Sequence, residues 1–122
     1  VAGFSYEGAL GAPTLTYGQI ADVRGLNGED GVNRLDLRAQ PGDAGGPVFD
    51  ETGTVVGLLL PAKTDNRTLP DNVSLAASAE ILNNVLSKAG LTGKSAEAQT
   101  QISPNELGRR ATGMTVLVHC WD

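Results

Sequence analysis

The chain has 122 residues, of which 40% are hydrophobic, 4% are aromatic and 16 are glycine, and its formal net charge is −5. A chain of this length buries one modest core, and its negative charge disfavours nucleic acid or an anionic membrane surface as a partner. No apolar run approaches the ~18 residues of a membrane-spanning helix. The single cysteine, Cys120, excludes an internal disulfide and a multi-cysteine zinc site. We expect no metal and no cofactor.

Short β-strands are predicted over most of the first 77 residues. Residues 14–24 alternate imperfectly between apolar and polar side chains, as a half-buried strand does, and a turn over residues 27–31 follows. The next segment, residues 34–38, alternates cleanly. This pattern predicts that Leu35 and Leu37 face the core and that the charged residues face solvent.

Glycines crowd into the loop that follows, Pro-Gly-Asp-Ala-Gly-Gly-Pro over residues 41–47. Three glycines within Gly42–Gly46 imply positive φ angles or a close approach of another group, and Asp43 can accept hydrogen bonds that hold the turn. Successive N–H groups in such a loop can converge on an anion or a developing oxyanion. The same residues are also common in simple turns before a strand, and on their own they leave both alternatives open.

A hairpin and a further strand follow the loop. Val48-Phe49 begins a strand, residues 50–53 form a polar turn, and residues 54–60 return as a buried strand. Residues 63–72 are polar and predict an exposed loop, and residues 73–77 predict the next strand.

One helix is predicted over residues 78–89. Ser78 is a favourable N-cap, Glu80 complements the helix dipole, and Gly90 ends the helix. Its apolar residues form one stripe, which indicates a helix packed on the strands: Ile81, Leu82, Val85, Leu86 and Ala89.

The remainder of the chain divides into a linker and a strand. Residues 91–111 are rich in Gly, Ser, Thr and Gln and predict a linker or extended loop, with one possible helical turn at residues 104–108. Residues 112–122 alternate and predict a terminal β-strand that packs on the other strands. Neighbouring residues on a strand face opposite sides, so His119 and Cys120 are not expected to share a metal or to form a catalytic pair.

The loop and its surroundings resemble the trypsin-like serine peptidases. The loop is similar to their nucleophile motif G-D-S-G-G-P, with Ala44 in the place of the serine. The order of loop, hairpin with a polar tip and V-x-G strand is similar to trypsin-like and bacterial HtrA-like peptidases. Residues 1–4 and 14–20 resemble the first strands of their second barrel, and the resemblance covers residues 1–90.

This resemblance implies an all-β fold, the C-terminal half of a trypsin-like double β-barrel with one C-terminal helix. The predicted terminal strand is an addition that lies beyond the residues that resemble the family. The family carries its catalytic histidine and aspartate on the first barrel, and the single histidine here, His119, lies where the family has no catalytic residue. We therefore expect the chain to require a first barrel or a homodimer partner. The resemblance also implies a periplasmic or secreted location.

The resemblance assigns roles to individual residues. The N–H groups of Gly42 and Ala44 correspond to the oxyanion hole, and Asp43 shapes the loop together with Gly45 and Gly46. Leu60-Pro61-Ala62 falls on the edge strand that pairs with the substrate backbone. Arg38 falls near the base of the specificity pocket, where it would favour acidic or C-terminal peptide ligands, although its position on a strand is equally compatible with a side chain in solvent.

Three functions follow from these assignments. The methyl group of Ala44 cannot attack a carbonyl, so the first is a catalytically inactive pseudo-protease that binds a peptide or protein. The second is a fragment of an active serine endopeptidase that carries a Ser-to-Ala change. The third is a purely structural domain in which the glycine loop is only a turn.

Overall fold

The computed structural model describes residues 1–4, 11–25, 28, 30–40, 42–64, 67–93, 100–118 and 120. Its strands are β1 (Ala2–Gly3), β2 (Thr14–Leu15), β3 (Gln19–Asp22), β4 (Val32–Asp36), β5 (Pro47–Phe49), β6 (Val55–Leu59), β7 (Lys63–Thr64), β8 (Arg67–Thr68) and β9 (Val73–Ser78). Its helices are α1 (Ala79–Lys88) and α2 (Pro104–Met114). Neither helix is both long enough and apolar enough to cross a membrane.

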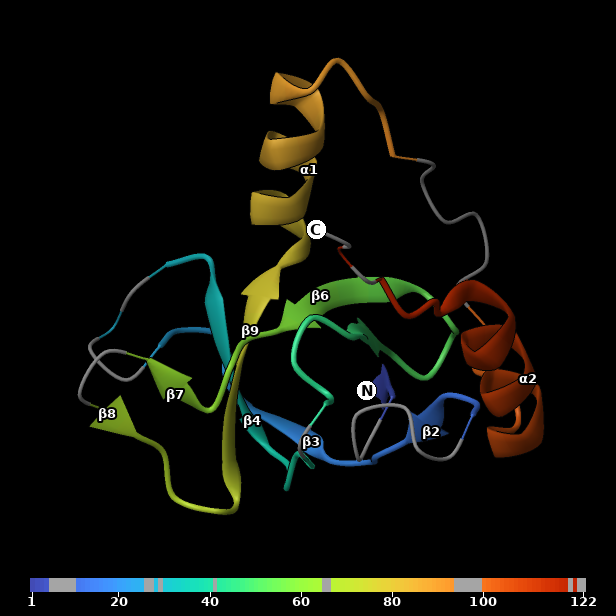
Figure 1. Ribbon diagram of the computed structural model, residues 1–122, viewed down its shortest axis with the longest axis horizontal. Coiled ribbons are helices and arrows are strands. Elements are labelled where there is room, and N and C mark those ends of the chain that lie inside the picture. Colours follow the sequence, from blue (N-terminus) through green and yellow to red (C-terminus); the bar gives the residue numbers. More distant parts are fainter. Residues whose placement is uncertain are drawn as a thin grey trace.

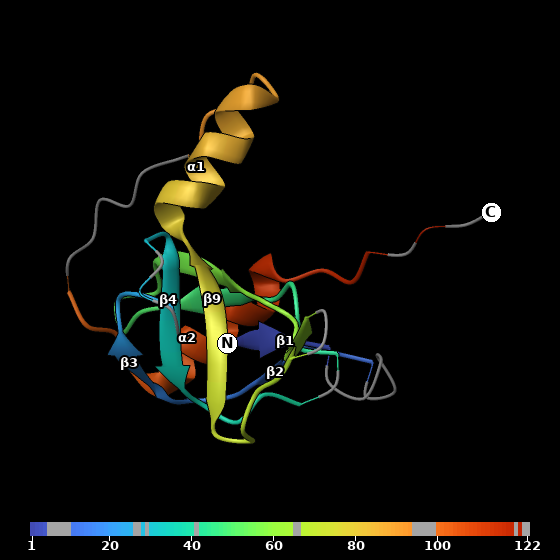
Figure 2. The ribbon, with the colours of Figure 1, turned by 90° about the vertical axis from the view of Figure 1, so that its left-hand side faces the viewer.

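Five antiparallel strands form the main sheet, in the order β3-β4-β9-β6-β5. The strand β9 is central and pairs with β4, beside it in Figure 2, and with β6. Both outer pairs, β3–β4 and β5–β6, contain a register irregularity. Irregularities of this kind increase the local twist and bend a strand, so the sheet curls into a half-barrel.

The short pair β1–β2 forms a separate two-stranded sheet. Beyond the paired residues, the backbone nitrogen of Thr16 donates to the carbonyl oxygen of Val1 at 2.9 Å, which extends the pairing. On its other side β1 lies against β5. A Cβ atom on Gly46 would collide with the carbonyl oxygen of Ala2, so the two backbones meet where only glycine fits.

The core lies inside the curled sheet. Its buried members are Val1, Leu35, Leu37, Val48, Leu59 and Ala76. The prediction that Leu35 and Leu37 face inward is confirmed, and the charged residues between and after them, Asp36 and Arg38, are exposed. The buried hydroxyl of Ser74 donates to the carbonyl oxygen of Leu37 at 2.8 Å, which ties β9 to the chain that follows β4.

The predicted helix over residues 78–89 is present as α1. The hydroxyl oxygen of Ser78 accepts a hydrogen bond from the backbone nitrogen of Ile81 at 3.4 Å, as an N-cap does, and Gly90 follows with a φ of 76°. The expected packing is weaker than its apolar stripe indicates, because no residue of α1 is buried. Figures 1 and 2 show α1 standing away from the barrel.

At the end of the chain, the possible helical turn at residues 104–108 is present as the start of a longer helix, whereas the predicted linker and strand are wrong where that helix lies. The predicted linker over residues 91–111 and the predicted strand over residues 112–122 are both interrupted by α2, which has Ser103 as its N-cap and Pro104 in its first turn. Residues 115–118 and 120 that follow belong to no strand. His119 lies outside the described residues.

The helix α2 packs on the barrel beside β2 (Figure 1). Ala111 on its inner face is fully buried, and a side chain at Gly108 would lie in ordinary contact with Leu15, 3.7 Å away. The carbonyl oxygen of Glu51 accepts a hydrogen bond from the nitrogen of Ile102 at 3.0 Å just before the helix. The packing of α2 therefore holds this part of the chain on the barrel.

Candidate functional site

The glycine loop adopts the conformations that its composition predicts. Gly42 has a φ of 92° and Gly45 has a φ of 84°, both in the left-handed region that favours glycine. Two hydrogen bonds fix the loop to β6: the nitrogen of Gly45 donates to the oxygen of Leu59 at 2.7 Å, and the nitrogen of Leu59 donates to the oxygen of Gly46 at 2.9 Å. The loop therefore has a defined shape on the rigid sheet.

Asp43 holds the loop from inside. Its side chain is 1% exposed, and its Oδ2 accepts a hydrogen bond from the nitrogen of Gln40 at 2.8 Å. Its backbone nitrogen donates to the oxygen of Gln40 at 3.1 Å, and its carbonyl oxygen accepts from the nitrogen of Gly46 at 3.0 Å. A Cβ atom on Gly3 would lie 2.7 Å from Oδ1, so β1 also packs directly on this carboxylate.

Two N–H groups of the loop remain available for a ligand. The N–H groups of Asp43, Gly45 and Gly46 are used within the protein, whereas no acceptor for those of Gly42 and Ala44 exists among the described residues. Gly42 and Ala44 are both exposed. Donors on alternate residues of a tight turn can bind one carbonyl or anionic oxygen, which is the chemistry of an oxyanion hole.

The loop offers these donors without a nucleophile. The side chain of Ala44 is a methyl group, and the single histidine of the chain lies outside the described residues. No cluster of three or more His, Cys, Asp or Glu side chains that could hold a metal ion occurs in the described part of the chain. The loop can therefore bind a polar oxygen, but it has no hydroxyl or thiol group to attack it.

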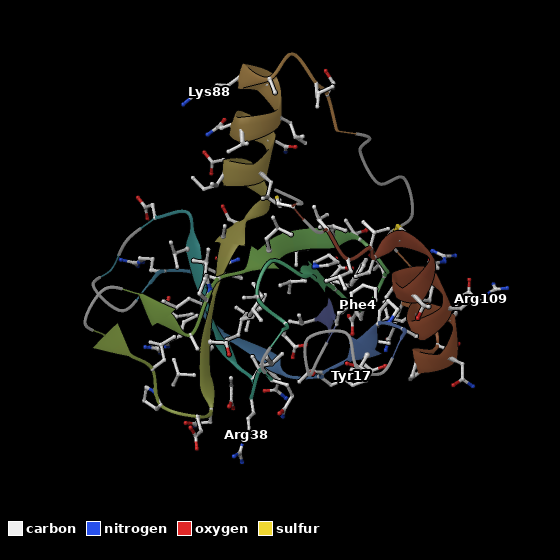
Figure 3. The ribbon with its side chains drawn as sticks, in the orientation of Figure 1. Phe4, Tyr17, Arg38, Lys88 and Arg109 are labelled. Atoms are coloured by element: carbon white, nitrogen blue, oxygen red, sulfur yellow. The ribbon has the colours of Figure 1, made fainter. Side chains whose placement is uncertain are left out.

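A cleft of about 460 Å³ opens beside the loop. Its lining comes from the loop itself, from Gly3 at the end of β1 and the next residue, Phe4 (labelled in Figure 3), and from the sheet residues Pro47 and Leu58. The remaining lining comes from the end of α2 and the residues that follow it. The loop residues are Gly42, Ala44, Gly45 and Gly46, and the residues that end and follow α2 are Met114, Thr115, Val116, Leu117 and Val118. Among the described residues that line the cleft, none is charged.

The segment Leu60-Pro61-Ala62 does not line this cleft, and two of its main-chain groups form hydrogen bonds within the protein. The nitrogen of Leu60 donates to the oxygen of Leu75 at 2.8 Å, and the oxygen of Ala62 accepts from the nitrogen of Leu69 at 3.3 Å. Proline has no N–H group to donate. The nitrogen of Leu60, the nitrogen of Pro61 and the oxygen of Ala62 are therefore closed to a ligand that would need a hydrogen bond from or to them.

Arg38 points into solvent. Its side chain is 73% exposed and forms an ion pair with Asp71, with Nη2 and Oδ2 3.7 Å apart. Figure 3 shows Arg38 directed away from the barrel. Of the two orientations that the sequence left open, the structure has the solvent-facing one, and Arg38 is absent from the cleft.

The residues after the loop that line the other side of the cleft were not predicted from the sequence. Met114 to Val118 reach it because α2 turns the chain back toward the barrel. A sequence signal for this helix exists: Ser103 and Glu106 have the spacing of a capping box, with Pro104 at the first helical position. Ser103 does accept a hydrogen bond from the nitrogen of Glu106, at 3.1 Å.

Comparison with known families matches residues 1–58 to the trypsin-like peptidase domain. Among curated proteins, an uncharacterized protein, y4bJ of Sinorhizobium fredii (strain NBRC 101917 / NGR234), is 27% identical over 112 residues, which cover 87% of this chain and 18% of that protein. The chain thus corresponds to less than a fifth of that relative's length. No solved structure matches the chain.

The family match agrees with the architecture. A curled five-stranded half-barrel sheet with two helices is consistent with one barrel of a trypsin-like fold, so the fold class predicted from the sequence is confirmed, apart from the terminal strand. The match reaches through the glycine loop and β5 into β6. It supports a peptidase-related domain and carries no information on whether the domain cleaves, binds or only supports other parts of a protein.

Proposed function

We propose that this chain is a catalytically inactive, peptidase-related domain that binds a peptide or a segment of another protein at the glycine loop. The observation that carries the proposal is the pair of N–H groups on Gly42 and Ala44, which are free of acceptors in the described part of the chain and flank the buried Asp43. A carbonyl oxygen of a ligand can accept from both donors. Ala44 has no nucleophilic atom, so binding is not followed by cleavage.

The cleft favours binding over a purely structural role. A loop that is only a turn does not require free N–H groups beside a cleft of about 460 Å³. The described lining residues are uncharged, which suits a peptide backbone with apolar side chains. A bacterial, HtrA-like origin, an extracytoplasmic location, and a first barrel or second copy as partner belong to the same proposal, and they rest on the family resemblance.

The absence of catalysis is tested by restoring the serine. The variant Ala44→Ser, treated with a fluorophosphonate probe, is expected to remain unlabelled, because serine is a weak nucleophile without an adjacent base. Intact-mass spectrometry detects the adduct, with trypsin as the positive control. Stoichiometric labelling would show that the chain contains a base that activates position 44, and would favour the fragment of an active endopeptidase.

Binding is tested by NMR with an uncharged, extended probe, acetyl-Thr-Val-Thr-Val-Thr-Val-amide. We expect the probe to shift the amide resonances of Gly42–Gly46. The variant Ala44→Trp fills the cleft from an exposed position and should abolish these shifts, whereas Ala21→Trp, exposed on β3 and outside the cleft, should leave them unchanged. Shifts confined to other parts of the protein, or none, would contradict the proposed site.

A further inference from the structure

The segment after α2 begins at a fixed point. Thr115 is 9% exposed, and its Oγ1 donates to the carbonyl oxygen of Ala111 at 2.7 Å. Ala111 itself is fully buried against the barrel. With a φ of −101° and a ψ of 129°, Thr115 directs the chain into an extended conformation at the end of the helix. The start of this segment is therefore held in place by the packing of α2.

The next three residues form an extended apolar segment without a strand partner. Val116 is 75% exposed, Leu117 is 42% exposed and Val118 is 79% exposed. Residues 115–118 are assigned to no strand, and no hydrogen bond joins the backbone of residues 116–118 to another described residue. Figure 2 shows the chain leaving the barrel after α2. A segment of this kind presents unpaired N–H and C=O groups, as an edge strand does.

This segment and the glycine loop line the same cleft. On the loop side, Gly42, Gly45 and Gly46 have no side chains, so the backbone of a ligand can approach closely. On the other side stand valine and leucine side chains, which pack well against aliphatic side chains on a neighbouring strand. The segment Leu60-Pro61-Ala62, which the family resemblance predicts to pair with a ligand backbone, is not part of this lining.

We propose that residues 115–118 form the second wall of the binding site and pair with an extended, uncharged peptide that carries aliphatic side chains. The peptide adds a strand beside residues 115–118 and directs one carbonyl oxygen to the N–H groups of Gly42 and Ala44. A charged side chain is disfavoured because the described lining of the cleft offers no opposite charge to compensate its loss of water. This inference rests on the proposed function, since it concerns the ligand of the same cleft.

The variant Leu117→Asp tests the wall. It places a carboxylate in the apolar lining at a half-exposed position, so the fold should be retained, which the dispersion of the amide spectrum checks. We expect its affinity for acetyl-Thr-Val-Thr-Val-Thr-Val-amide to fall about tenfold or more, since an unpaired charge is costly in an apolar contact. Val85→Asp is the matched control: it changes an exposed aliphatic residue of α1, outside the cleft, and should bind as the unmodified chain does.

Amide shifts at residues 115–118 together with Gly42–Gly46, and weaker binding by Leu117→Asp, would support the inference. Shifts at Gly42–Gly46 alone, with unchanged binding by Leu117→Asp, would overturn it and leave the proposed function intact. Tighter binding by Leu117→Asp would overturn it as well, because the segment would then compete with the ligand. Equal binding of a probe with glutamate in place of its central valine would overturn the ligand class, and no shifts in either region would overturn both proposals.

Discussion

Asp43 determines the shape of the glycine loop, whereas its neighbour Ala44 determines which chemistry the loop can perform. The buried carboxylate of Asp43 accepts from the backbone of Gln40 and lies against β1, and it does so whatever side chain follows it. Ala44 is exposed and has no part in holding the loop. The loop can therefore hold its shape and present its two donors with a methyl group at position 44, which is compatible with the proposed binding function.

Asp50, in the turn between β5 and β6, makes stability depend on pH. Partial burial raises the pKa of Asp50, but hydrogen bonds from the nitrogen and hydroxyl of Thr52 and from the nitrogen of Thr54 outweigh it, so the pKa lies below its ordinary value. A carboxyl whose folded pKa is lowered stabilises the folded state above its unfolded pKa of about 3.9, and this contribution disappears as the pH falls through the lower folded pKa.

We therefore expect Asp50→Asn to lose stability relative to the unmodified chain at pH 6, with the difference shrinking below about pH 4, where the unfolded carboxyl protonates. Urea unfolding at a series of pH values measures the difference. Asp71→Asn, which removes an equally negative but exposed side chain, is the control for the change in net charge. A difference for Asp50→Asn that stays constant from pH 6 to pH 2 would show that the turn does not depend on the ionised carboxylate.

At the scale of elements, α2 depends more on its packing against the barrel than on the helix propensity of its own residues. Arg109 and Arg110 both pair with Glu106 on its exposed side, while Ala111 faces the barrel. The helix also contains Gly108 in its interior, where glycine is unfavourable relative to alanine. Side-chain packing thus stabilises a helix whose own propensity is modest.

The variant Gly108→Ala should stabilise the protein by about 0.5–1 kcal/mol, because alanine restricts the unfolded chain and favours the helix. The added methyl group would meet Leu15 at an ordinary contact distance of 3.7 Å. Thermal unfolding measures the effect. Gly113→Ala, in the last turn with open space around it, should give a smaller gain because helix ends fray. A loss of stability for Gly108→Ala would mean that α2 lies too close to β2 to accept a methyl group at position 108.

Local patterns predicted the elements that depend on neighbouring residues. The alternation around Leu35 and Leu37, the glycine turn and the N-cap Ser78 all specify structure within a few residues, and each appears as expected. The alternation from residue 112 onward misled because Thr112, Gly113 and Met114 are held in a helix that starts at Pro104. The sequence analysis predicted that helix only as a possible turn at residues 104–108. The cleft that the helix completes depends on long-range packing, which no local pattern reports.

At the scale of the whole molecule, closure of the barrel depends on two backbones in contact. β1 lies against the start of β5, with Gly46 facing the carbonyl oxygen of Ala2 and Gly3 facing Asp43. Neither position has room for a side chain. The same contact supports the glycine loop, so the closure of the barrel and the shape of the candidate site depend on one another.

The variant Gly46→Ala should therefore open this contact and destabilise the whole protein, by about 2 kcal/mol or more, since overpacking a rigid contact forces the backbones apart. Urea unfolding gives the free energy, and the amide resonances of Ala2 and Gly3 report the separation of β1. Ala44→Ser, two residues away and exposed, should change stability by less than about 0.5 kcal/mol. A neutral Gly46→Ala would show that β1 is not seated on β5.

The central position of β9 also determines when the protein can fold during its synthesis. The pairs β3–β4 and β5–β6 precede β9 in the chain, and both need β9 as their shared neighbour. Isolated hairpins are marginally stable in water, and a ribosome adds about 5–20 residues per second. Until Val73–Ser78 leaves the ribosome, the two hairpins remain separate and their apolar faces stay exposed to solvent. The nascent barrel thus forms in one late step, and chains that stop before residue 73 are expected to aggregate or to require a chaperone.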